Sequence, residues 1–186
     1  MQIFKSFTPE VVELLKNGAV GIIPTDTIYG VATCLFNQES VERLYQIKRR
    51  EKTKPVGTIL INDPFQIEHI TEPKELRMAQ VYWPGPTSVI IPVSHKLDYA
   101  HKGYDSLPFR IPAVKELSEL IAQTGPLATS SANFSGQPPA TTLQDAISNF
   151  RELVDFYVDG GDLSLHKPSK IIRFDDSGEV EIIRGE

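Results

Sequence analysis

The interpretation of this chain starts from residues 19–30, AVGIIPTDTIYG. Residues 19–23 form an apolar run, which predicts a buried strand, and Pro24 stops the pairing of that strand. Two hydroxyls, a carboxylate and a phenol then follow within residues 25–29. Ligands of open α/β sheets bind at the carboxyl ends of strands, so this segment is a candidate site. A turn whose side chains bond to their own backbone is an equal alternative.

Outward from this segment, predicted helices and strands alternate along the chain. Helices are expected at 9–17, 39–50, 73–82, 113–123 and 142–150, and the third is expected to turn Met78 and Val81 inward. Strands are expected at 19–23, 56–61, 87–93, 107–111, 126–129, 153–158, 170–174 and 179–183, with Pro92 marking an edge or an end. Residues 94–106 are expected to form a long polar loop. We predict an α/β fold, with a single domain over 1–186 and a twisted mixed sheet flanked by helices.

Composition narrows the class of protein. The 186 residues are 40% hydrophobic, enough for one core, and the net charge of −5 disfavours general attraction to nucleic acid. With no leader-like N-terminus and no apolar run near the roughly 18 residues that span a membrane, a cytoplasmic protein without membrane contact is expected. Phosphate-loop, GxGxxG, GxSxG and HExxH motifs are missing from the sequence, and Cys34 is the only cysteine.

A short basic segment stands out in this acidic chain. Residues 43–54 hold six lysines and arginines against one glutamate. Lys48 and Arg50 are two apart where a helix is expected to give way to extended chain, so both would point the same way and could grip a triphosphate. From the charge alone, an ordinary solvated helix end is the favoured interpretation.

Small polar side chains gather again at 130–136, SSANFSG, beyond another expected strand. Their hydroxyls and amide supply neutral hydrogen-bond donors, and Gly136 permits close approach of the backbone. The segment is predicted to bind the phosphate or ribose of a nucleotide, and a helix-capping turn is the alternative.

These motifs, in this order, resemble the YrdC/Sua5 family of threonylcarbamoyl-AMP synthases. The resemblance rests on PTDTIYG at 24–30, the basic stretch at 48–55 and SSANFSG at 130–136, together with WPGPT at 83–87 and FRIP at 109–112. It covers most of the chain and corresponds to the short form, without an additional C-terminal domain. It implies a concave basic groove and the substrates ATP, L-threonine and bicarbonate, with Mg²⁺ accompanying ATP. The product would serve a downstream tRNA threonylcarbamoyl transferase that modifies an adenosine next to the anticodon, with weak tRNA binding possible.

The resemblance also assigns roles to residues. Lys48 and Arg50 would be catalytic, holding the ATP phosphates and the developing charge. The substrate pocket would include Thr25, Thr27, Tyr29 and Arg110, and the nucleotide would also contact Ser131, Asn133 and Ser135. No protein ligand for a metal is assigned, with Asp26 only a weak candidate. The segment at 168–171, PSKI, carries Lys170 where the family has threonine, which leaves the role of that threonine open here.

Two other classes are compatible with parts of the sequence. An RNA-binding module could use the basic segment to hold tRNA or double-stranded RNA without adenylating activity, although phosphate contacts dominate such binding and the net charge is unfavourable. A carbamoyl-transfer domain of the kind found in hydrogenase-maturation proteins is the other, but those chains are larger and carry cysteine-rich regions.

Overall fold

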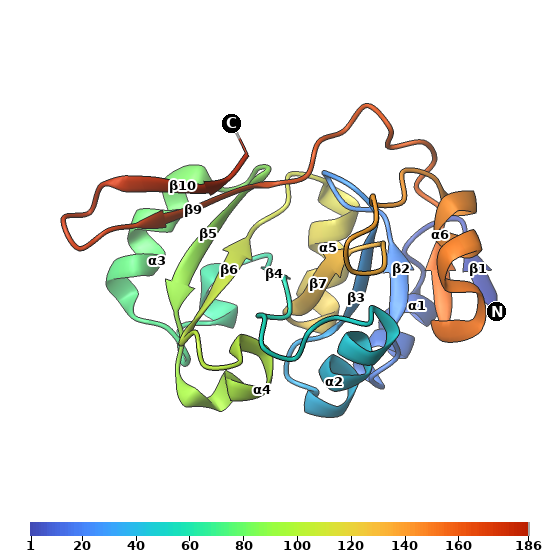
Figure 1. The fold of residues 1–186 in the computed structure, drawn as a ribbon, viewed down its shortest axis with the longest axis horizontal. Helices are drawn as coiled ribbons and strands as arrows, with labels where there is room; N and C mark the ends of the chain where they lie inside the picture. Colours follow the sequence, from blue (N-terminus) through green and yellow to red (C-terminus); the bar gives the residue numbers. More distant parts are fainter. Residues whose placement is uncertain (186) are drawn as a thin grey trace.

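A computed structural model describes residues 1–185 and places ten strands in one mixed sheet (Figure 1). The strands are β1 (Gln2–Phe4), β2 (Gly21–Ile23), β3 (Gly30–Cys34), β4 (Thr58–Leu60), β5 (Thr87–Pro92), β6 (Ser106–Arg110), β7 (Leu127–Ser131), β8 (Phe156–Val158), β9 (Lys170–Phe174) and β10 (Val180–Arg184). Their order across the sheet is β1-β8-β2-β3-β7-β4-β6-β5-β9-β10. The sheet combines parallel pairs (β1–β8, β2–β8, β4–β6, β5–β9) with antiparallel ones, so the predicted mixed sheet is confirmed.

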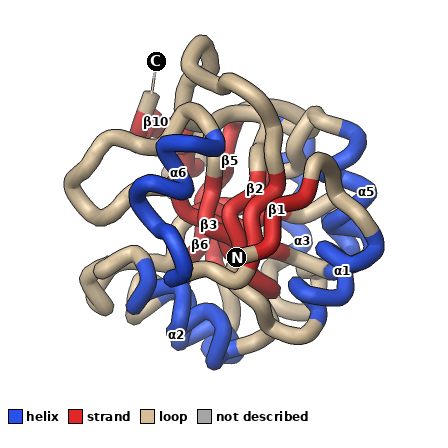
Figure 2. Tube along the Cα trace, turned by 90° about the vertical axis from the view of Figure 1, so that its right-hand side faces the viewer, coloured by secondary structure: helices blue, strands red, loops and turns tan. Residues whose placement is uncertain are grey.

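Helices cover both faces of the sheet. They are α1 (Pro9–Lys16), α2 (Gln38–Ile47), α3 (Pro73–Ala79), α4 (Asp98–His101), α5 (Lys115–Thr124) and α6 (Leu143–Phe150). Figure 2 shows α1 and α5 on one side of the strands and α2 and α6 on the other. Pro9 is the first residue of α1, a position that suits the fixed φ of proline. A capping box between Thr142 and Asp145 begins α6.

Strand periodicity divides the apolar residues between two cores. Ile22 and Ile59 pack in the cluster that includes α2 and α6, whereas their chain neighbours Ile23 and Leu60 pack in the cluster with α1 and α5. Successive strand residues point to opposite faces, so central strands buried on both sides have continuous apolar runs. That is the pattern from which the strand at 19–23 was predicted.

Several predicted elements differ from those observed. The sequence interpretation missed β1 and β3, and the expected loop at 94–106 contains α4 together with a 3-10 turn at His95–Leu97. The prediction that Val81 points inward is wrong, because its side chain is 80% exposed, and the buried residues of α3 are Leu76 and Ala79. Pro92 is the last residue of β5, which confirms its expected place at a strand end.

No helix within residues 1–185 combines the length and apolar character required to cross a membrane.

Candidate functional site

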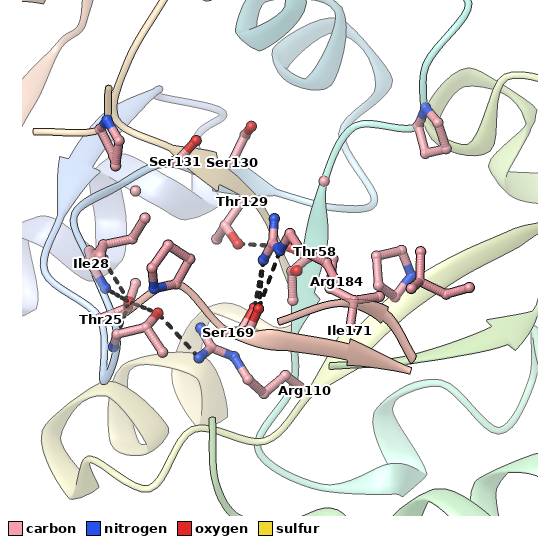
Figure 3. A pocket seen from close by; sticks show the side chains of 18 of the residues that line it. Thr25, Ile28, Thr58, Arg110, Thr129, Ser130, Ser131, Ser169, Ile171 and Arg184 are labelled. Atoms are coloured by element: carbon pink, nitrogen blue, oxygen red, sulfur yellow. Dashed lines mark hydrogen bonds between the residues drawn. The ribbon is translucent and has the colours of Figure 1, made fainter. Parts of the chain in front are cut away.

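A cavity of about 470 Å³ opens on the sheet, with walls from segments that are far apart in the sequence (Figure 3). By strand alternation, Thr58 and Thr129 point to the same face as Leu60 and Leu127, which pack with α5. The apolar face of β4 and β7 therefore becomes polar where it leaves the cover of α5. Further walls come from the turn after β2, the segment after α2, β6 and the hairpin of β9 and β10.

The turn after β2 is built by Thr25. Its Oγ1 donates to the carbonyl of Ile28 (2.6 Å), accepts from the backbone N–H groups of Thr27 (3.1 Å) and Ile28 (3.2 Å), and lies 3.0 Å from Thr27 Oγ1. Thr25 therefore serves its own turn, which was the alternative interpretation of this segment. Thr27 Oγ1 also accepts a 3.3 Å hydrogen bond from Arg110 Nη1, and both threonines line the cavity.

Arg110 and Asp26 form a buried ion pair in the cavity wall. Arg110 Nη1 lies 2.9 Å from Asp26 Oδ1, and the two side chains are 3% and 6% exposed. Burial raises the pKa of the Asp26 carboxyl above its ordinary value, although Arg110 opposes this shift. Arg110 Nε has no hydrogen-bond partner among the described residues. A buried donor without a partner is costly, so Nε is an unsatisfied group within a guanidinium that lines the cavity.

Two more arginines line the same cavity. Arg50 is fixed by a 2.8 Å hydrogen bond from its Nε to the carbonyl of Pro55, and burial lowers the pKa of its guanidinium. Arg184 Nη2 donates to the carbonyl of Ser169 (2.8 Å) and to Ser169 Oγ (3.0 Å), as Figure 3 shows. No aspartate or glutamate belongs to the described lining, and Arg110 is paired with Asp26 behind it. Arg50 and Arg184 face hydroxyls and backbone with no carboxylate partner among the described residues. This arrangement suits a polyanionic ligand.

The lining is a poor fit for a metal held by the protein. Mg²⁺ prefers carboxylate oxygens, and the one candidate from the sequence, Asp26, is engaged by Arg110 and by the backbone N–H of Ala113 (3.4 Å). Within residues 1–185, no group of three or more His, Cys, Asp or Glu side chains is placed to hold an ion.

Of the other residues predicted for the site, some line the cavity and some lie behind its wall. Tyr29 and Ser131 line the cavity, whereas Lys48, Asn133 and Ser135 are not part of its lining. Tyr29 Oη donates to the carbonyl of Gly161 (2.9 Å) and accepts from the N–H of Gly160 (2.8 Å), so it anchors the segment that leads from β8 to β9. Burial raises the pKa of the Tyr29 hydroxyl.

The basic segment does not have the predicted extended geometry. Lys48 caps α2 in the right-handed helical region, and Arg49 follows with a φ of 51°. The two cations therefore point different ways, with Arg50 at the cavity and the Lys48 ammonium group at the backbone of residues 131–133. The expectation of one shared side fails because Arg49 is left-handed.

The sequence interpretation overlooked the contribution of the C-terminal hairpin. Pro168, Ser169, Ile171 and Arg184 line the cavity, while the unusual Lys170 does not. PSKI had been noted only as a departure from a pattern, and Arg184 had no motif around it. Its place becomes apparent only once β9 pairs with β5.

Comparison with known proteins identifies the family. Residues 13–185 match the Sua5/YciO/YrdC family, described as telomere recombination, and the chain belongs to this family. The family predicted from the sequence motifs is confirmed.

Individual relatives extend along most of the chain. A protein of Methanocaldococcus jannaschii is 33% identical over 183 residues, covering 95% of this chain and 86% of its own length. The threonylcarbamoyl-AMP synthase of Coxiella burnetii is 32% identical over 169 residues, covering 87% of this chain and 89% of its own.

Solved structures share the fold. Sua5 of Pyrococcus abyssi complexed with L-threonine superposes with a TM-score of 0.86 at 25% identity over 98% of this chain. This chain spans 56% of that protein's length. YciO of Escherichia coli superposes with a TM-score of 0.81 at 18% identity, covering 98% of this chain and 93% of YciO.

Proposed function

We propose that this protein is an L-threonylcarbamoyl-adenylate synthase, which condenses L-threonine, bicarbonate and ATP to threonylcarbamoyl-AMP and pyrophosphate. The observation that carries the proposal is the cavity in which Arg50, Arg110 and Arg184 face hydroxyl groups without a lining carboxylate. Two of the three substrates are anions, and the third carries a carboxylate. The relatives named threonylcarbamoyl-AMP synthase, and the fold shared with a Sua5 that binds L-threonine, support the same reaction.

Threonine and ATP would occupy different ends of the cavity. Thr27 and Arg110 would bind threonine, because a guanidinium that lines the cavity suits its carboxylate, while Thr25 and Tyr29 shape this end. Arg50 and Arg184 would bind the ATP phosphates beside Ser131. The turn that follows Ser131 would support the nucleotide end of the cavity. Lys48, Asn133 and Ser135 would act there through their contacts with one another.

The proposed chemistry needs charge stabilisation more than a strong base. The amine of threonine attacks the carbon of CO₂ and loses a proton, which gives an anionic carbamate; with bicarbonate as the source, a C–O bond breaks and water leaves as the C–N bond forms. A carbamate oxygen then attacks the α-phosphorus of ATP, and the bond from that phosphorus to the pyrophosphate oxygen breaks. Because the nucleophile is already anionic, orientation and cationic stabilisation of the phosphates supply most of the catalysis. A cavity rich in arginine and hydroxyl groups, with no histidine in its described lining, fits such a step.

Several parts of the proposal concern molecules outside the chain. Mg²⁺ would arrive with the ATP phosphates and neutralise their charge, since the lining offers it no carboxylate. The product would pass to a tRNA threonylcarbamoyl transferase in the cytoplasm, for modification of an adenosine next to the anticodon. Binding of tRNA to this chain itself is the competing function, and the exposed basic residues of 49–54 are its only support.

The test is pyrophosphate release from ATP and bicarbonate in the presence of each of the twenty amino acids. Release that requires both L-threonine and bicarbonate is expected. A matched pair of variants places the reaction in the cavity: Arg50→Ala should lose most of the release, whereas Lys52→Ala, an exposed cation of the same segment, should keep it. If no amino acid supports release while RNA binds in a salt-dependent manner, the RNA-binding alternative is the better account.

A further inference from the structure

The end of α2 directs its basic residues toward two different targets. The N–H of Arg49 bonds to the carbonyl of Gln46 (3.1 Å) and the N–H of Arg50 to that of Tyr45 (3.0 Å), the bond pattern of a Schellman motif. Glycine is usual at the left-handed position of this motif, yet here it is Arg49, with a φ of 51°. The turn sends Lys48 and Arg49 toward residues 131–137, which we name the nucleotide turn, and leaves Arg50 at the cavity.

The Lys48 ammonium group is fully engaged by the nucleotide turn. The residue is 2% exposed, and its Nζ donates to the carbonyl of Ser131, the carbonyl of Asn133 (2.8 Å) and Asn133 Oδ1 (3.4 Å). An ammonium group has three donors, so these acceptors account for all of them. A direct bond to a phosphate would require Lys48 to give up one of these contacts.

Arg49 contacts the nucleotide turn from the surface of the protein. Its guanidinium carbon lies 4.7 Å from the ring centroid of Phe134, and that ring packs against Phe150 of α6 at 5.1 Å. The backbone adds a contact, since the N–H of Ser135 donates to the carbonyl of Lys48 (3.3 Å). Two adjacent residues thus hold the turn by ion-to-carbonyl, cation–π and backbone contacts.

Within the turn, the side chain of Asn133 is also committed to structure. Its Oδ1 accepts from Ser131 Oγ (2.5 Å), and its Nδ2 donates to the carbonyls of Phe134 (3.0 Å) and Gln137 (2.5 Å). The part of this assembly that reaches the cavity is the wall formed by Ser130 and Ser131. Whatever holds the turn therefore sets where this wall lies.

We propose that Lys48 and Arg49 are positioning residues that hold the nucleotide turn in its binding shape and do not touch the nucleotide. This inference rests on the proposed function and adds Arg49, to which the sequence interpretation gave no role. It predicts a distinctive pattern of binding. A residue that contacts the β- or γ-phosphate contributes to ATP binding but not to AMP binding, whereas a residue that shapes the wall contributes to both.

The experiment measures the dissociation constants of AMP and ATP by calorimetry for wild type and four variants. Lys48→Met removes the ammonium group and keeps an unbranched side chain. Arg49→Asn removes the cation, and asparagine tolerates the left-handed backbone. Arg50→Ala represents a phosphate contact, and Lys52→Asn is the control for loss of an exposed charge in the same segment.

Lys48→Met should weaken AMP and ATP by the same factor, roughly tenfold or more, given the usual strength of hydrogen bonds from charged groups. Arg49→Asn should weaken both by about two- to fivefold, the scale of an exposed cation–π contact. Arg49→Lys, which keeps a cation over Phe134, should recover most of that loss. Arg50→Ala should weaken ATP more than AMP, and Lys52→Asn should change neither.

A loss of ATP affinity in Lys48→Met that leaves AMP binding intact would overturn the proposal, because it marks a direct phosphate contact. Unchanged affinities in both Lys48→Met and Arg49→Asn would overturn it as well. If Lys48→Met does not fold, as judged by circular dichroism, Arg49→Asn and Phe134→Leu carry the test, and their double variant should lose no more than either alone. Failure of wild type to bind either nucleotide would instead contradict the proposed function.

Discussion

At the scale of single residues, the site depends on buried charges that are held by named partners. Arg110 faces Asp26 and Thr27, and Lys48 faces the carbonyls of the nucleotide turn. Such groups are expensive to bury unless they are paired. Each of them therefore affects stability as well as binding, and the two effects can be measured separately.

The Arg110–Asp26 pair gives the first prediction. Arg110→Met leaves the Asp26 carboxylate buried without its cation, so the free energy of unfolding should fall by about 3–5 kcal/mol. Urea denaturation at neutral pH measures the change. Adding Asp26→Asn should restore most of the loss, because the uncompensated charge is gone. A cost below about 1 kcal/mol for the single variant would mean that the pair is not buried as described.

Lys48 gives a prediction about pH. Burial, with a smaller contribution from Arg50, lowers its pKa from an ordinary 10.5 to about 7 in the folded state. The unfolded chain therefore binds more protons between these two values, and the folded state gains stability as pH rises through this window, with a limiting slope of about 1.4 kcal/mol per pH unit.

Urea denaturation of wild type and Lys48→Met at pH 7, 8 and 9 tests this prediction. Subtracting the variant removes the contributions of all other titrating groups, so the difference should rise with pH in favour of wild type. A difference that does not change with pH would show that Lys48 keeps its ordinary pKa in the folded protein.

The sequence predicted residue types better than residue directions. Thr27, Tyr29, Arg50, Arg110 and Ser131 all line the cavity, since hydroxyls and cations near the ends of strands and helices gather over the polar part of the sheet. It could not predict that Lys48 would turn away. The direction of Lys48 depends on one residue with a left-handed backbone, position 49. A glycine there would have indicated such a turn, but the residue is arginine.

At the scale of elements, the cavity wall requires close approach of β4 to β7. Thr58 pairs with Thr129, and Gly57 precedes that pair with a φ of 140°. A Cβ at Gly57 would collide with the carbonyl oxygen of Thr129, so glycine is needed here for space as well as for conformation.

Gly57→Ala is therefore expected to cost more than backbone strain alone. The matched control is Gly103→Ala, because Gly103 also has a positive φ (86°) but no atom within 4 Å of an added Cβ. We expect Gly57→Ala to lower the free energy of unfolding by about 1–3 kcal/mol more than Gly103→Ala, the usual cost of overpacking. Equal effects in urea denaturation would show that the strands can separate without penalty.

Elements with strong apolar periodicity were predictable, and those without it were not. In α2, the residues Val41, Leu44 and Tyr45 are buried, and their helical spacing forms one apolar face. The missed strand β3 reads GVATC, whose small residues give neither an alternating pattern nor a long apolar run. It is a strand because β2 and β7 pair with it on both sides, which is tertiary information.

At the scale of the whole molecule, the site is assembled by long-range pairing. The segment after β8 runs along the top of the molecule in Figure 1 to reach β9, and the parallel pairing of β9 with β5 brings the C-terminal hairpin to the cavity. Ser169 and Arg184 enter the lining in this way. Single-sequence reasoning could identify the hairpin but not its neighbour in the sheet.

Arg184 yields a prediction with a control inside the same hairpin. Arg184→Ala removes a cation from the cavity and should weaken ATP binding by about tenfold, within the usual range for charge-assisted hydrogen bonds. Arg173→Ala removes a cation that is bonded to Glu181 and does not belong to the lining, so ATP affinity should be unchanged. Equal losses in both variants, measured by calorimetry, would point to damage to the hairpin instead of a lost contact.

The most direct test of the central claim is to identify the product formed from carbon-13-labelled bicarbonate, L-threonine and ATP. Mass spectrometry should find threonylcarbamoyl-AMP that carries one labelled carbon, in an amount equal to the pyrophosphate released. The Arg50→Ala variant should form little of it. Pyrophosphate release without a labelled adenylate, or no product from folded wild-type protein, would contradict the assignment of this cavity to threonylcarbamoyl-adenylate synthesis.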